Sequence, residues 1–138
     1  MAKRMMEIEV TKVRKTGLNW TCVIPTNMYG PHDKFSTTVG HVIGGLIVKA
    51  YDQRKAHLNV YGTGIALRQF LYVEDFARIL LHMLDNPAPF DNAILAPPQE
   101  YTIKQVAETI AARVNKPLKF DVTMSDGQLR KYSRSKGD

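Results

Sequence analysis

The chain has 138 residues and a formal net charge of +6, and its hydrophobic content of 44% is ordinary for a globular domain. No apolar run reaches the roughly 18 residues that a membrane span needs, and a single cysteine, Cys22, excludes an internal disulfide and a cysteine-built zinc cluster. Residues 1–7 lack the apolar core of a secretory signal, so we expect a cytoplasmic protein. The basic charge favours an anionic partner, either a nucleic acid, an acidic membrane surface or a phosphorylated small molecule.

The pattern of the first 35 residues predicts a helix, a strand and a polar loop. Residues 2–15 place Met6, Val10 and Val13 at i, i+4 and i+7, which is typical of a helix. Residues 19–24 predict a buried strand. Residues 25–35 are rich in turn formers, and such a loop directly after a buried strand suits a ligand site at the carboxyl end of a parallel sheet.

The middle of the chain alternates helix and strand patterns. Residues 41–51 predict a helix, and residues 58–61 and 69–73 predict short strands separated by a glycine-rich turn. Asp75 is the predicted cap of a helix with an apolar face.

The last third has one strong local signal. Thr102 and Gln105 form a capping box, which predicts a helix start. Residues 92–96 and 118–122 predict strands, and the polar residues that follow predict a mobile tail.

This alternation of helices and strands indicates an α/β class. The nine glycines include no G-x-G-x-x-G pattern behind a strand, so the phosphate-cradling turn of a dinucleotide fold is not among these residues.

Four segments together resemble one family, the GDP-L-fucose synthases of the extended short-chain dehydrogenase/reductase class. They are residues 23–35 (VIPTNMYGPHDKF), residues 40–43 (GHVI), residues 61–75 with YGTG and RQFLYVED, and residues 125–131 (SDGQLRK). The resemblance implies the carboxy-terminal, substrate-binding part of a Rossmann-type fold, with the amino-terminal dinucleotide-binding part missing. It also implies one α/β fragment over residues 1–138, in which residues 1–35 are a remnant of the NADP-binding domain and residues 36–138 are mainly substrate-binding.

The resemblance further implies a reaction. The family epimerises the two carbons beside the ketone of GDP-4-keto-6-deoxy-D-mannose and then reduces the ketone with NADPH. His41 matches the histidine that acts as acid and base in epimerisation, a role that suits imidazole. Lys3 matches the lysine of a Tyr-x-x-x-Lys pair, whose tyrosine would precede Met1. We therefore expect NADP to be the cofactor of the full-length enzyme, and we expect this chain alone to lack turnover and not to bind NADP.

Binding roles follow from the same resemblance. The stretch Pro25, Thr26, Asn27 and Met28 matches the nicotinamide side of the NADP site, to which His41 and Lys3 also belong.

The residues implied for the GDP-sugar substrate lie in several segments. Lys49 and Arg68 match contacts to the diphosphate, and Tyr61, where the family usually has tryptophan, offers an aromatic face for the nucleoside. Asp126 and Lys131 match the nucleotide contacts near the end of the chain. A carboxylate can accept hydrogen bonds from N1–H and the 2-amino group of guanine, which would explain a preference for GDP sugars.

The expected partners are the GDP-sugar and a second copy of the chain, since the family commonly dimerises through the helix that carries Lys3. We expect no nucleic acid, no membrane and no metal. Three alternatives stay open: another extended short-chain dehydrogenase acting on nucleotide sugars, a non-catalytic GDP-sugar-binding fragment, and a basic nucleic-acid binder, which lacks aromatic-basic interleaving.

Overall fold

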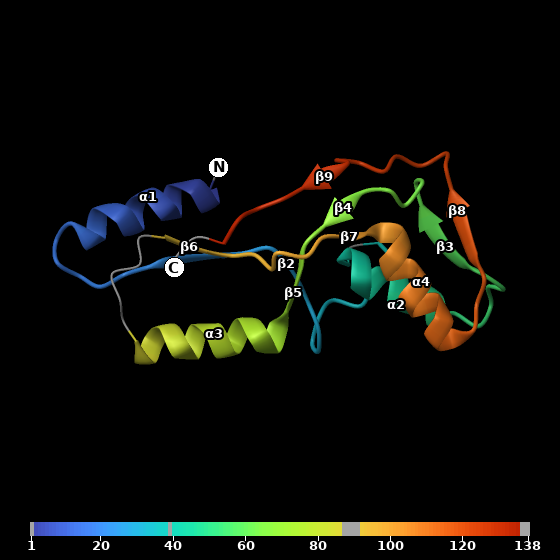
Figure 1. The fold of residues 1–138 in the computed structure, drawn as a ribbon, viewed down its shortest axis with the longest axis horizontal. Helices are drawn as coiled ribbons and strands as arrows, with labels where there is room; N and C mark the ends of the chain where they lie inside the picture. The colour runs from blue at the N-terminus through green and yellow to red at the C-terminus, as the bar shows by residue number, and fades with distance from the viewer. Residues whose placement is uncertain (1, 39, 87–91, 136–138) are drawn as a thin grey trace.

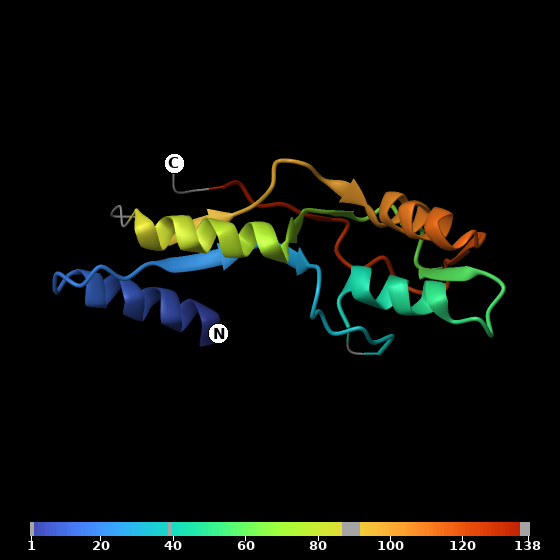
Figure 2. The same cartoon turned by 90° about the horizontal axis from the view of Figure 1, so that it is seen from below.

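The computed structural model describes residues 2–38, 40–86 and 92–135, and these form an elongated molecule with two lobes (Figures 1 and 2). Helices and parallel strands alternate along the chain, as the α/β class requires. Within the described residues, no helix is both long and apolar enough to cross a bilayer.

The first lobe is a strand pair between two helices. Strands β1 (Cys22–Pro25) and β6 (Asn92–Leu95) run parallel, with Cys22 opposite Asn92. Helices α1 (Ala2–Arg14) and α3 (Val73–Asp85) lie on opposite sides of this pair (Figures 1 and 2), and neither contains a buried residue. The first lobe therefore contains α3 and β6, which come after residue 35 in the chain, as well as α1 and β1. The predicted assignment of residues 1–35 to the NADP-binding domain and of residues 36–138 mainly to the substrate-binding domain stays a prediction.

The second lobe holds the main apolar core. Helices α2 (Val42–Tyr51) and α4 (Ile103–Val114) pack on the parallel strands β3 (Leu58–Tyr61) and β8 (Leu118–Asp121). Six buried side chains form its centre: Leu46, Ala50, Leu58, Val60, Ala107 and Ala111. The predicted capping box at the start of α4 is confirmed, because Thr102 Oγ1 accepts from the Gln105 N–H at 3.1 Å and Gln105 Oε1 accepts from the Thr102 N–H at 2.8 Å.

The two lobes meet at a second parallel pair, β2 (Asn27–Tyr29) and β5 (Phe70–Tyr72). The ring of Tyr29 lies edge-on to Phe70, with the ring centroids 6.3 Å apart, and 5.4 Å from the Tyr72 ring. The prediction that residues 25–35 form only a loop was wrong at β2, because the backbone after Thr26 finds a partner strand 43 positions further along the chain.

The prediction of a mobile tail was also wrong in part. Strand β4 (Leu67–Arg68) pairs antiparallel with β7 (Tyr101–Thr102) and parallel with β9 (Arg130–Lys131). Beyond β9, the buried Gln69 side chain binds the backbone of Ser133 at both its N–H (2.7 Å) and its carbonyl (2.8 Å). Hydrogen bonds to its backbone thus fix the segment around β9 and Ser133, although its side chains gave no periodic pattern in the sequence.

The predicted helix cap at Asp75 was wrong. Helix α3 begins at Val73, its N-cap residue is Tyr72, and that residue makes no side-chain capping bond. Asp75 lies in the first turn, where a carboxylate is favoured by the helix dipole, and it pairs with Arg78 at 3.2 Å. A favourable acid within the first turn was mistaken for a cap.

Candidate functional site

A cavity of about 260 Å³ lies where the two lobes meet. It is lined by Asn27, Met28, Gly40, His41, Val42, Ile43, Arg68 and Phe70. Four of these eight residues were predicted as site residues from three separate segments of the sequence. Folding therefore brings three of the predicted cofactor-binding residues, one of which is the predicted acid/base histidine, and one predicted diphosphate contact to a single cavity.

The cofactor-side wall is built by the step from β1 to β2. Thr26 lies between the two strands, and its N–H donates to the Leu95 carbonyl of β6 at 3.1 Å. The Asn27 amide donates to the Gln69 carbonyl at 2.9 Å, which holds the wall against the second lobe. Pro25 ends β1 and is partly buried, whereas Met28 is 37% exposed.

Pro25 and Thr26 do not line the cavity, but the Thr26 hydroxyl beside it has an unmet hydrogen-bonding need. Thr26 Oγ1 is buried and has no partner among the described residues. Buried polar groups without a partner are rare and call for an explanation. A nicotinamide carboxamide could supply both a donor and an acceptor there, so this part of the chain fits the nicotinamide end of NADP.

His41 stands at the amino-terminal end of α2, where it is the N-cap residue without a side-chain capping bond. Its side chain is 74% exposed, and its Nδ1 lies 2.9 Å from Oδ1 of Asp33. The Asp33 carboxyl is 11% exposed and also accepts the Lys34 N–H at 2.7 Å. The hydrogen bond from His41 lowers the pKa of Asp33, against the opposing effect of burial.

Arg68 adds a guanidinium to the lining of the same cavity. Its Nη1 donates to the adjacent Leu67 carbonyl at 2.7 Å, and the residue is partly buried. The remaining guanidinium donors can serve an anion in the cavity. In the β4–β9 pair, Arg68 is directly opposite Lys131, which is exposed, so two predicted contacts to the substrate lie on neighbouring strands.

Lys49 and Tyr61 are brought into direct contact by the packing of α2 on β3. The Lys49 Nζ lies 3.6 Å from the centroid of the Tyr61 ring, a cation–π geometry. The ring remains 51% exposed. A cation therefore covers part of the aromatic surface that was predicted to stack on the nucleoside.

Asp126 holds the turn that follows Tyr61. Its Oδ1 accepts the N–H groups of Thr63 (2.8 Å) and Gly64 (3.1 Å), and its Oδ2 accepts the Thr63 hydroxyl (2.7 Å). The Thr63 hydroxyl is the largest cause of the lowered pKa of Asp126. This carboxylate thus has a structural role in the turn, and its predicted contact to guanine stays a prediction.

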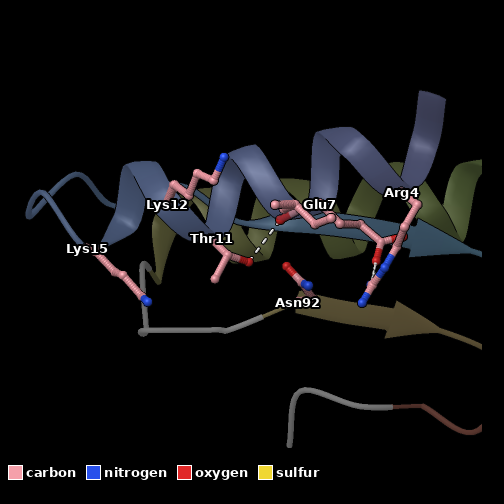
Figure 3. Close-up of a pocket in the computed structure, with 7 residues that line it drawn as sticks. Arg4, Glu7, Thr11, Lys12, Lys15 and Asn92 are labelled. Atoms are coloured by element: carbon pink, nitrogen blue, oxygen red, sulfur yellow. Dashed lines mark hydrogen bonds and ion pairs between the residues drawn. The ribbon is translucent and has the colours of Figure 1, made fainter. Parts of the chain in front are cut away.

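Lys3 is exposed on α1 and lines neither this cavity nor a second one. The second cavity, of about 400 Å³, lies between α1 and β6 (Figure 3). Its polar lining includes Arg4, which pairs with Glu7, and Asn92, whose buried Oδ1 has no partner among the described residues. None of the predicted site residues lies there.

Sequence reasoning missed two residues that support the main cavity. Asp33 lies in the segment 23–35 that carries part of the resemblance, and it was given no role there. An acidic side chain eight residues before a histidine, across a turn-rich segment, could have indicated the contact. Gln69 gave no signal at all, because its three tail and loop contacts are 28 and 64 residues away in the chain.

Comparisons with known proteins point in one direction. Residues 1–96 match the model of the NAD dependent epimerase/dehydratase family. The chain is 40% identical over 137 residues to a GDP-L-fucose synthase of Dictyostelium discoideum, with 94% of this chain and 43% of that protein covered. It is 33% identical over 132 residues to the GDP-L-fucose synthase of Escherichia coli (strain K12), covering 86% of this chain and 41% of that protein.

A solved structure agrees with these sequence matches. The crystal structure of a GDP-L-fucose synthetase from Naegleria fowleri bound to NADP superposes with a TM-score of 0.85 at 36% identity. The match covers 95% of this chain and 44% of that one. The chain therefore spans less than half the length of the relatives it matches.

Proposed function

This chain belongs to the NAD dependent epimerase/dehydratase family, and on that basis we propose that it carries the substrate-binding part of an NADPH-dependent GDP-L-fucose synthase. The proposed substrate is GDP-4-keto-6-deoxy-D-mannose, and the proposed product of the whole enzyme is GDP-L-fucose. The observation that supports this most is the cavity that joins Asn27 and Met28 to His41 and Arg68. These residues come from three separate segments of the sequence, and each segment resembles the same family.

The proposed epimerisation needs a group that exchanges protons at the carbons beside the ketone. His41 suits this task, because imidazole titrates near neutral pH and its ring is exposed in the cavity. One proton leaves the C–H bond on one face of the sugar, and one proton returns on the other face, so no net proton is consumed. The second acid or base of the pair has no counterpart among the residues of this cavity.

The proposed reduction uses NADPH, which supplies a hydride to the ketone carbon when it is bound. Met28, which lines the cavity, would flank the nicotinamide ring. Thr26 and Pro25 lie directly before this wall, and the unpaired Thr26 hydroxyl would bind the carboxamide. Lys3 would hold the nicotinamide ribose in the complete enzyme, a role that stays a prediction because Lys3 does not line the cavity.

The charged part of the substrate would lie along the second lobe. Arg68 offers guanidinium donors for the diphosphate, and Lys49 and Lys131 add point charges. Tyr61 would contact the nucleoside on the part of its ring that Lys49 leaves uncovered. Asp126 has three of its acceptor positions occupied by the turn, so only one of the two predicted hydrogen bonds to guanine can form while the turn stays intact.

These 138 residues alone should show no turnover, because they contain neither a G-x-G-x-x-G turn nor the tyrosine that would pair with Lys3. NADPH oxidation by the purified chain in the presence of the keto-sugar nucleotide would contradict this. A second candidate function is a GDP-sugar-binding fragment without catalysis, which the same cavity supports equally well.

Calorimetry with GDP-L-fucose, UDP-glucose and NADPH tests the binding proposal. We expect GDP-L-fucose to bind in preference to UDP-glucose. Replacing Arg68 by Met should weaken that binding by roughly 10-fold or more, because a hydrogen bond to a charged group contributes about 1.5–3 kcal/mol. The control Arg54→Met removes the same charge from an exposed arginine that pairs with Asp52 outside the cavity. Equal affinities for all three nucleotides, or equal effects of both variants, would overturn the proposal.

A further inference from the structure

The loop before α2 is shaped so that it delivers one carboxylate to His41. Residues 30–33 read Gly-Pro-His-Asp, and the Asp33 N–H donates to the Gly30 carbonyl at 3.3 Å. His32 has a φ of +66°, and proline before a residue of positive φ is the pattern of a type II turn. The turn fixes the direction in which the chain leaves toward Asp33.

Tight packing then holds the loop against the start of α2. A Cβ atom at Gly40 would lie 2.3 Å from the Ser36 carbonyl oxygen and 2.7 Å from that of Lys34, so no side chain fits there. A Cβ atom at Gly44 would lie 3.4 Å from Oδ2 of Asp33, which places this carboxylate over the first turn of the helix. The first turn of α2 contains no acidic residue of its own.

The two oxygens of Asp33 differ in their surroundings. Oδ1 accepts the Lys34 N–H and contacts His41 Nδ1, whereas Oδ2 is buried and has no partner among the described residues. The positive end of a helix dipole favours a carboxylate in this position. The carboxylate is therefore held in place from several sides, while the ring that it contacts is 74% exposed.

We propose that Asp33 is a positioning residue for His41: it accepts the Nδ1–H of the neutral imidazole, fixes the ring, and leaves Nε2 unprotonated for the cavity. In histidine, the hydrogen bond at one ring nitrogen decides which nitrogen carries the proton. No other interaction of the His41 ring is seen in the described part of the chain. The catalytic meaning of this arrangement rests on the proposed acid/base role of His41. The inferred tautomer of the ring is independent of that role.

Nitrogen-15 NMR of the labelled 138-residue chain tests the inference without any ligand. At about pH 8, above the ordinary pKa of imidazole, long-range proton–nitrogen correlations distinguish the protonated from the unprotonated ring nitrogen. We expect the His41 Nδ1 signal to have the shift of a protonated nitrogen and the Nε2 signal that of an unprotonated one. A wild-type ring with its proton mainly on Nε2 would overturn the proposal, whether or not any variant folds.

A matched pair of variants adds a second readout. Asp33→Ala should move both His41 nitrogen shifts toward those of a free imidazole. Asp52→Ala removes a carboxylate at the other end of the same helix, where Asp52 is the C-cap residue, and should leave the His41 shifts unchanged. Identical His41 shifts in the wild type and in Asp33→Ala would refute the positioning role.

The two proposals fail separately. An Nδ1-protonated His41 in a chain that binds no GDP-L-fucose would support the positioning role and contradict the proposed function. Selective GDP-L-fucose binding by a chain whose His41 carries its proton on Nε2 would support the proposed function and contradict the positioning role.

Discussion

Replacing Gln69 by Ala should destabilise the protein by about 2–4 kcal/mol. The residue is 1% exposed, and its side chain makes three hydrogen bonds: one to the Pro97 carbonyl at 2.7 Å and two to the backbone of Ser133. Each bond between neutral groups contributes about 0.5–1.5 kcal/mol, which gives roughly 1.5–4.5 kcal/mol for the three. Water can reach Ser133 once it is released, because that residue is only partly buried, so we place the effect below the top of this range.

Urea titration followed by far-UV circular dichroism measures this free energy, and hydrogen exchange at the Ser133 amide measures the local effect. In the wild type this amide donates to Gln69 Oε1, so the variant should lose its protection. The control Gln53→Ala changes an exposed glutamine and should stay within about 0.5 kcal/mol of the wild type. A Gln69→Ala protein that matches this control and keeps the Ser133 amide protected would refute the reasoning.

Three further outcomes are expected. Stability should fall as the pH drops from about 4 toward 2, because hydrogen bonds from Arg54 lower the pKa of Asp52 to about 2 in the folded state. The unfolded state then binds more protons than the folded state in this range, and thermal melts at several pH values measure the loss of stability. Gly64→Ala should destabilise by at least about 2 kcal/mol in urea, because φ is +78° and the new Cβ would lie 2.7 Å from the Phe120 ring. Thr102→Ala should lose about 1 kcal/mol of helix capping, seen as a lower Tm.

Elements with strong local signals could be predicted from the sequence. The capping box at Thr102 and the strand Leu58–Tyr61 agree with the structure, because each depends on residues a few positions apart. Helix α2 begins one residue later than expected, with His41 as its N-cap residue. Helix boundaries of this kind commonly vary by one or two residues.

Contacts between distant segments could not be predicted in the same way. The pairing of β4 with β9 joins residues 63 positions apart, and Asp126 reaches the turn at Thr63 over the same separation. Neither pairing leaves a periodic trace in the sequence. The candidate site residues were found through family resemblance, and the structure adds which of them share a cavity.

The exposure of α1 indicates that this helix unfolds locally before the core of the second lobe. The helix has 13 residues, none of them buried, and Met5, Met6 and Ile8 are 61%, 67% and 45% exposed. Isolated helices shorter than about 12–15 residues are marginal in water, so α1 depends on its few contacts with the neighbouring strands. The basic residues of α1 should therefore be cleaved by trypsin under native conditions well before the core of the lobe built on Leu58 and Val60 becomes accessible.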